Sequence, residues 1–160
     1  MEQFYEFNEI TMNHELEKNE PLLTHVAVYL LLVKDEQILL SRRYQTGWED
    51  GMYTLVAGHV DRGETILSAM IREGEEEVGI VLDKDDLAVV HVMNRKSNRP
   101  YVDFFIKANF WEGEPTIIEP DKCDSMRWFP ISNLPTNTLP HVAQALEFIQ
   151  NGVYFSEVGF

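Results

Sequence analysis

Residues 65–78 combine the spacing of an amphipathic helix with a dense run of glutamates. The stretch contains no proline, and small or apolar residues recur at helical spacing at Leu67, Ile71, Gly74 and Val78. Gly79 follows, and glycine ends helices readily because it adopts the left-handed conformation without strain. The sequence therefore predicts a helix over 65–78 that packs one face against a core.

The glutamates lie where a helix accommodates them least. On a helical wheel Glu73, Glu76 and Glu77 share one side, and like charges one turn apart repel by about 0.2–0.5 kcal/mol per pair. They also lie near the C-terminus, which is the negative end of the helix dipole. Two interpretations are open: a solvated acidic face in which Arg72 offsets Glu76, or a site for a divalent cation, since Mg²⁺ prefers oxygen ligands.

The remaining patterns predict strands around this helix and a second helix near the C-terminus. Residues 26–33 are continuously apolar, which predicts a strand covered on both faces, and a polar turn predicts that it forms a hairpin with 37–41. Further strands and a closing helix are expected at 53–56, 87–93, 102–110, 126–129 and about 140–150. The expected fold class is α/β, an α/β/α sandwich with a mixed β-sheet between the helices.

Composition bounds the partners of the chain. It has 160 residues, with 27 Asp plus Glu against 13 Lys plus Arg, and a formal net charge of −14. Its 44% hydrophobic content predicts a folded domain. The charge disfavours binding to DNA or RNA polymers and to anionic membranes, which require a basic surface. Cys123 is the only cysteine and the N-terminus lacks a signal-peptide pattern, so we expect a soluble cytoplasmic protein.

A loop with two glycines, 58–64, leads into the acidic helix and allows a ligand to approach the backbone closely. Loop and helix together resemble the Nudix box, G-x5-E-x7-R-E-U-x-E-E-x-G-U, in which U is a bulky apolar residue. The matching positions are Gly58, Glu64, Arg72, Glu73, Glu76, Glu77, Gly79 and Ile80. Gly74, at the first U position, is the one departure. Leu39–Arg43 and Trp128–Pro130 are similar to segments of the nucleoside triphosphate pyrophosphohydrolase branch of this family.

The resemblance to Nudix hydrolases implies a metal site. Glu73, Glu76 and Glu77 would hold Mg²⁺, or Mn²⁺, together with the carbonyl of Gly58. Such an ion neutralises the phosphates of a nucleotide and polarises the phosphorus that water attacks. The resemblance thus favours the cation interpretation of the acidic helix.

The resemblance also implies supporting and catalytic roles outside the three box glutamates. Arg72 would fix the rotamers of the carboxylates, and Glu64 would orient Arg72, with helix capping as its alternative. Glu119 is the candidate general base, with Glu73 as the competitor. An exposed loop glutamate is the alternative interpretation of Glu119.

Several residues are candidates for binding the rest of the substrate. Arg43 would bind phosphate through its forked donors, with a surface ion pair as the alternative. His59 would contact phosphate unless it is an ordinary loop histidine. Tyr53 is a stacking candidate with a core position as its alternative, and Asn137 resembles a base-contacting asparagine of the family.

The domain interpretation is an N-terminal arm or edge strand at 1–22, a Nudix domain at 23–152 and a tail at 153–160, with a homodimer left open. The expected activity is Mg²⁺-dependent hydrolysis of a pyrophosphate bond, with (d)NTP converted to NMP and pyrophosphate as the leading reaction. Arg95 stands where ADP-ribose hydrolases of the family carry a proline. ADP-ribose or another sugar nucleotide is the enzymatic alternative, and a Nudix module that binds a nucleotide without cleaving it is the non-catalytic one.

Overall fold

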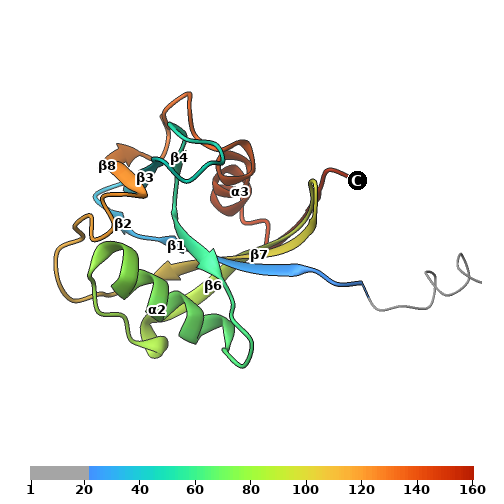
Figure 1. The fold of residues 1–160 in the computed structure, drawn as a ribbon, viewed down its shortest axis with the longest axis horizontal. Coiled ribbons are helices and arrows are strands. Elements are labelled where there is room, and N and C mark those ends of the chain that lie inside the picture. Colours follow the sequence, from blue (N-terminus) through green and yellow to red (C-terminus); the bar gives the residue numbers. More distant parts are fainter. Residues whose placement is uncertain (1–21) are drawn as a thin grey trace, which may run out of the picture.

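Strand β1 (His25–Leu31) runs through the middle of the molecule (Figure 1). In this computed structural model, which describes residues 22–160, β1 pairs antiparallel with β5 (Val56–His59) and parallel with β7 (Pro100–Ala108). The sheet continues through β6 (Leu87–Lys96) to β9 (Phe155–Val158), in the order β5-β1-β7-β6-β9. The arm or edge strand expected at 1–22 lies outside the described residues except for Leu22.

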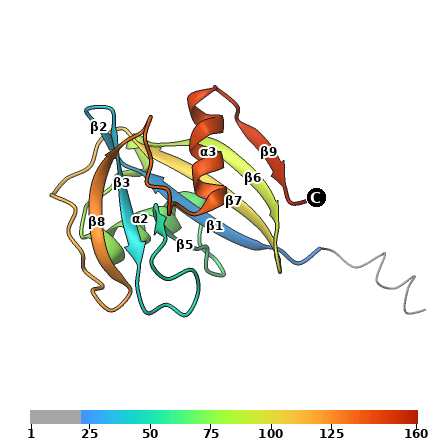
Figure 2. The same cartoon turned by 90° about the horizontal axis from the view of Figure 1, so that it is seen from above.

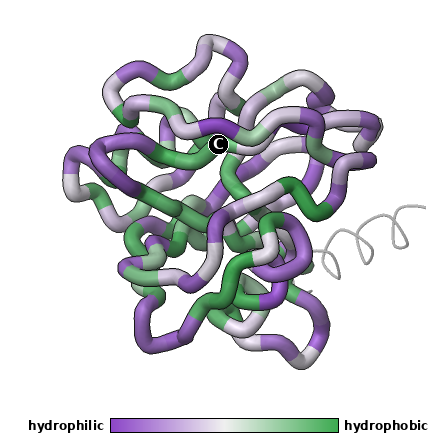
Figure 3. The backbone as a smooth tube through the Cα atoms, turned by 90° about the vertical axis from the view of Figure 1, so that its left-hand side faces the viewer, coloured by the Kyte–Doolittle hydropathy of each residue, from purple (hydrophilic) through white to green (hydrophobic). Residues whose placement is uncertain are grey.

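Two helices, α2 (Ile66–Val78) and α3 (Pro140–Gln150), cover the two faces of this mixed sheet (Figure 2). Alternate β1 side chains enter the two cores: Tyr29 packs with residues of α3, and Leu30 with residues of α2. Hydrophobic segments accordingly lie toward the centre of the molecule, and hydrophilic ones occupy outer loops (Figure 3). The α/β/α sandwich is confirmed, because β1 is buried on both faces as its continuous apolar sequence predicts.

A second, antiparallel sheet contains β2 (Val33–Lys34), β3 (Gln37–Arg43), β4 (Tyr53–Thr54) and β8 (Cys123–Pro130). The expected hairpin between 26–33 and 37–41 is wrong for most of its length. Only β2 pairs with β3, through a tight turn in which Asp35 and Glu36 have φ values of 52° and 61°. The apolar run divides between two sheets, and hydrophobicity does not reveal the division because the run stays apolar as far as Val33, which is partly buried in β2. The expected strand at 53–56 divides in the same way, between β4 and β5.

Helix α2 begins and ends where the sequence indicates, but its buried face is rotated from the expected one. Thr65 caps its N-terminus by reciprocal hydrogen bonds with Ser68, and Gly79, at φ 68°, ends it. The fully buried positions are Ala69, Met70, Gly74 and Val78, whereas Leu67 and Ile71 are only partly buried. Because of this rotation the side chains of Glu73 and Glu77 face β5. The three box glutamates therefore do not form one solvated patch.

Gly74, the departure from the Nudix box, is explained by its neighbour. A Cβ on residue 74 would lie 2.7 Å from Cδ1 of Leu82, so the Leu82 side chain fills the space of a bulky residue at this position. The helix keeps its packing against the sheet although its own side chain is missing there.

The C-terminal segment adds a strand to the sheet. Strand β9 pairs parallel with β6, and the buried His91 ring of β6 bonds to the Val153 carbonyl and to Ser156 Oγ, each at 2.8 Å. The tail expected at 153–160 therefore packs back on the domain over residues 155–158. A short 3₁₀ helix, η1 (Lys84–Asp86), precedes β6. None of the helices in residues 22–160 is long and apolar enough to cross a membrane.

Candidate active site

Glu73 lies in the angle between α2 and β5. Its carboxylate contacts Gly58 of β5, and a Cβ on residue 58 would overlap it. The Glu73 side chain is 12% exposed, and burial raises its pKa while the Arg72 guanidinium acts in the opposite direction. Glycine is thus needed at residue 58 for space, not for an unusual backbone conformation.

Glu77 is the most deeply buried of the three box glutamates. It accepts a hydrogen bond from the Ala57 amide at 3.2 Å, and burial raises its pKa to about 8, with the charges of Glu73 and Glu119 adding to the effect. An ionised carboxylate in this position is costly unless positive charge lies beside it. A cation next to Glu77 would therefore be stabilised.

Arg72 donates hydrogen bonds to three glutamates of the site. Its Nε and Nη2 donate to the two carboxylate oxygens of Glu64 at 2.8 and 2.9 Å, and Nη1 donates to Glu73 at 2.7 Å and to Glu76 at 3.2 Å. This forked pairing holds the pKa of Glu64 at about 2. Glu64 thus fixes Arg72, and Thr65 rather than Glu64 caps the helix.

The box carboxylates do not converge on one point. Glu73 and Glu76 face Arg72, while Glu77 faces Ala57, and among residues 22–160 no three His, Cys, Asp or Glu side chains are placed to hold one ion. The donor set still fits a hard divalent cation, because carboxylates and the Gly58 carbonyl are all oxygen ligands. Glu76 contacts Arg72 at 3.2 Å, and its side chain is 55% exposed.

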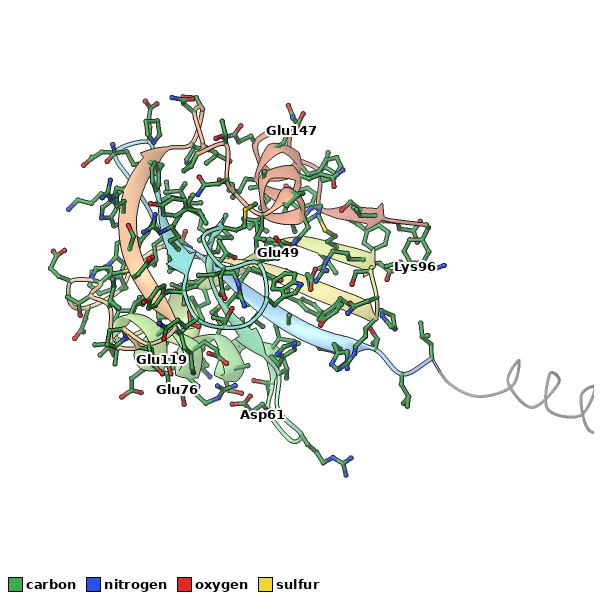
Figure 4. The ribbon with its side chains drawn as sticks, turned by 45° about the horizontal axis from the view of Figure 1, so that its top comes forward. Glu49, Asp61, Glu76, Lys96, Glu119 and Glu147 are labelled. Carbon is green, nitrogen blue, oxygen red and sulfur yellow. The ribbon has the colours of Figure 1, made fainter. Side chains whose placement is uncertain are left out.

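A cavity of about 240 Å³ opens beside Glu77, between α2, β3 and the segment that precedes β8. Glu119 enters it from that segment, and Lys122 Nζ donates to its carboxylate at 2.7 Å. Figure 4 draws Glu119 and Glu76 at the same edge of the molecule, with Glu147 on the opposite side. Because the charge of Glu119 raises the pKa of both Glu73 and Glu77, these carboxylates lie within electrostatic reach of one another.

The structure brings some of the substrate-binding candidates to cavities and leaves others elsewhere. Arg43 lines the Glu77 cavity, donates to the Trp48 carbonyl and Thr46 Oγ1, and forms no ion pair within residues 22–160. His59 lines a neighbouring pocket.

Tyr53 and Asn137 line neither cavity. Tyr53 is 7% exposed, packs its ring edge against Phe129 and places its hydroxyl 3.3 Å from Ser125 Oγ. Asn137 donates to the Gly51 carbonyl at 2.8 Å. Both side chains hold the loop around Gly51 and the β4 segment in place.

Several residues that line the two cavities were not predicted from the sequence. Lys122 is a single charged residue without a motif, and only the fold places it on Glu119. The neighbouring pocket, about 550 Å³, brings the β6–β7 hairpin to the loop after β3. Its unpredicted polar and aromatic lining residues include Trp48, Arg95, Asn98, Arg99 and Tyr101. No local pattern in the sequence connects these segments.

Comparison with curated proteins identifies hydrolases among the relatives. The NAD-capped RNA hydrolase NudC of Stutzerimonas stutzeri (strain A1501) is 25% identical over 109 residues, which cover 68% of this chain and 37% of that protein. The chain thus spans little more than a third of the length of this relative. An ADP-ribose pyrophosphatase of Methanocaldococcus jannaschii is 29% identical over 117 residues, which cover 72% of this chain and 68% of that protein.

Solved structures agree with the fold. A MutT NUDIX hydrolase from Burkholderia pseudomallei matches with a TM-score of 0.72 and 30% identity, over 78% of this chain and 97% of that one. The family model of the NUDIX domain matches residues 23–151, which include both helices and the whole Gly58–Ile80 segment. This chain therefore belongs to the NUDIX domain family.

Proposed function

We propose that this NUDIX-domain protein is a hydrolase that adds water to a pyrophosphate bond in a nucleoside di- or triphosphate derivative, with Mg²⁺ or Mn²⁺ as cofactor. The observation that carries the proposal is the meeting of Glu77 and Glu119 at one cavity, with burial raising the pKa of Glu77 to about 8 and the charge of Glu119 raising the pKa of Glu73 as well. Such carboxylates favour a divalent cation, and a cation makes an acidic surface attractive to phosphate.

The metal ligands in this proposal are Glu73, Glu76, Glu77 and the carbonyl of Gly58. The bound ion supplies positive charge that neutralises phosphate oxygens and polarises the attacked phosphorus. Arg72 holds Glu73 and Glu76 in place, and Glu64 holds Arg72. The two supporting residues therefore act on the carboxylates and do not contact the substrate.

Glu119 is the proposed general base. It accepts a proton from the attacking water, whose oxygen bonds to phosphorus while the bond from phosphorus to the leaving phosphate oxygen breaks. Glu73 is less suited to this role, because its carboxylate is packed against Gly58 and bonded to Arg72 at 2.7 Å. Lys122 must release Glu119 or move with it as the proton is transferred.

Arg43 and His59 are the proposed substrate contacts near the reacting phosphates. Arg43 lines both the Glu77 cavity and the neighbouring pocket, so its guanidinium can bind a phosphate that lies between them. His59 follows Gly58 directly and lines the same neighbouring pocket. Tyr53 and Asn137, which line neither cavity, would affect binding only by holding the loop around Gly51.

Two substrate classes are supported by different relatives. The match to a MutT NUDIX hydrolase at 30% identity supports (d)NTP, cleaved to NMP and pyrophosphate. The ADP-ribose pyrophosphatase relative supports a pyrophosphate that links two organic halves. Because NudC is named for NAD-capped RNA, an RNA end also belongs in the substrate test.

The test is hydrolysis of a panel of (d)NTPs, ADP-ribose, NAD⁺ and NAD-capped RNA by the wild-type protein with Mg²⁺, in water enriched in ¹⁸O. We expect one class to be cleaved, and the fragment that carries ¹⁸O identifies the attacked phosphorus. Binding of these compounds without any product, with Mg²⁺ or Mn²⁺, would leave a non-catalytic nucleotide-binding module and contradict the proposal.

A further inference from the structure

The neighbouring pocket, here called the arginine pocket, adjoins the Glu77 cavity. The two share Arg43, Thr54 and Ala57, so a ligand can extend from one into the other. At about 550 Å³ the arginine pocket is the larger, and it falls within the usual size range of sites for small organic ligands.

The charge of the arginine pocket is opposite to that of the protein. Arg43, Arg95 and Arg99 line it and no Asp or Glu does, in a chain with a net charge of −14. Arg95 is neutralised by the buried Asp103, with Nε 2.6 Å from its carboxylate. Arg43 and Arg99 form no ion pair within residues 22–160. Two guanidinium groups from different segments thus face one pocket without an acidic partner.

The aromatic rings that line the pocket differ in how closely other side chains pack on them. Tyr101 carries the Arg95 guanidinium at 4.4 Å and stacks on His25 at 5.2 Å, so its ring is already packed. Trp48 is 50% exposed and carries the Arg43 guanidinium at 4.8 Å from its ring centroid. Trp48 is more exposed than Tyr101, so the part of its ring that Arg43 does not cover offers a surface to a planar base.

We propose that the arginine pocket binds the nucleoside half of the substrate, with the base against Trp48, and that Arg99 binds a further phosphate on the ribose of that half. This assignment rests on the proposed function, because it places the pyrophosphate at Arg43, between the two cavities. The preferred substrate class is then a nucleoside pyrophosphate that carries a ribose phosphate in addition to the bond that is cleaved. Arg99 is the residue that determines this preference.

The test compares the binding of AMP and adenosine 2′,5′-bisphosphate in EDTA, where no hydrolysis is required. We expect the bisphosphate to bind at least about tenfold more tightly, since a charge-assisted contact to Arg99 is available only to its second phosphate. Arg99→Gln should remove most of this difference, whereas Arg127→Gln, an exposed arginine of β8 outside the pocket, should keep it. Equal affinities for both ligands, or equal effects of the two variants, would overturn the assignment.

Tryptophan fluorescence supplies a second readout. Binding should quench the fluorescence of the wild-type protein, and Trp48→Phe should abolish that change while Trp111 and Trp128 remain. Quenching that persists in Trp48→Phe would exclude the base from this ring.

The two proposals fail separately. If the bisphosphate preference is found but no pyrophosphate is cleaved, the proposed hydrolysis is contradicted and the arginine pocket stands. If pyrophosphates are cleaved but the preference is absent, only the assignment of the pocket is overturned.

Discussion

The carboxylate of Glu73 occupies the space in which a side chain on residue 58 would begin. Gly58 belongs to β5 and Glu73 to α2, so this contact fixes how closely the helix approaches the sheet. It also orders one glutamate of the proposed metal site, because Arg72 closes the other side of the same carboxylate at 2.7 Å. Any side chain at residue 58 would therefore displace the Glu73 carboxylate.

Gly58→Ala should displace Glu73 and lower kcat by about 10- to 100-fold, the usual effect of disturbing groups that orient metal ligands. The circular dichroism spectrum should remain that of the wild-type protein. Gly74→Ala is the matched control, since its new methyl would meet the apolar side chains of Leu82, at 2.7 Å, and Ile80, at 3.7 Å, and not a carboxylate; it should leave activity unchanged. Equal loss in both variants would show a general packing effect.

Arg72→Lys should raise the Mn²⁺ concentration for half-maximal activity by about 10- to 100-fold, because one ammonium cannot replace the forked contacts to Glu64, Glu73 and Glu76. Arg127→Lys, at an exposed arginine of β8 that lines neither cavity, serves as the control. A Mn²⁺ titration of both variants checks this. If the Mn²⁺ concentration for half-maximal activity is unchanged in Arg72→Lys, Arg72 does not hold the metal-binding carboxylates in place.

His141 should make the protein less stable as the pH falls below neutrality. Burial lowers the pKa of this imidazole to about 3, and one ring nitrogen is 3.1 Å from the Tyr29 hydroxyl. The unfolded chain therefore binds a proton below about pH 6.5 that the folded protein rejects until about pH 3, so stability is lost through that window as the pH decreases.

Between pH 7 and pH 5 this effect amounts to about 2 kcal/mol of unfolding free energy. In His141→Gln the unfolding free energy should fall less with decreasing pH, by that amount. This holds whatever the substitution does to stability at pH 7. Urea unfolding at both pH values measures it. Identical decreases in the two proteins would contradict the assigned burial effect.

The ends of α2 and the range of α3 were predictable from local signals. Gly79 sits at the left-handed end of α2, and residues 140–150 carry one apolar stripe after Pro140. The division of the apolar run between β1 and β2 was not predictable, because the residues on both sides of the change of sheet, Leu31 to Val33, are all apolar. Pairing of β1 with β5 and β7 depends on contacts distant in sequence.

The site residues that belong to a sequence motif were predictable. Those that come from segments distant in the sequence were not. Residues Gly58, Glu64, Arg72 and Glu73 match fixed positions of the Nudix box, and the structure brings them into contact. Tyr53 was proposed from its residue type alone, and a buried strand position fits the same residue type. The arginine pocket escaped prediction because Arg43, Trp48 and Arg99 come from segments that only the fold brings together.

The central claim is that the box carboxylates bind the metal ion required for pyrophosphate hydrolysis, and one comparison of variants tests it most directly. Steady-state hydrolysis of the cleaved panel compound with Mg²⁺ should fall by at least about 100-fold in Glu77→Gln, since the amide supplies no negative charge to a cation. Glu75→Gln, which changes an exposed neighbour on the same helix, should retain wild-type activity. Full activity of Glu77→Gln, or activity of the wild-type protein in excess EDTA, would contradict the account.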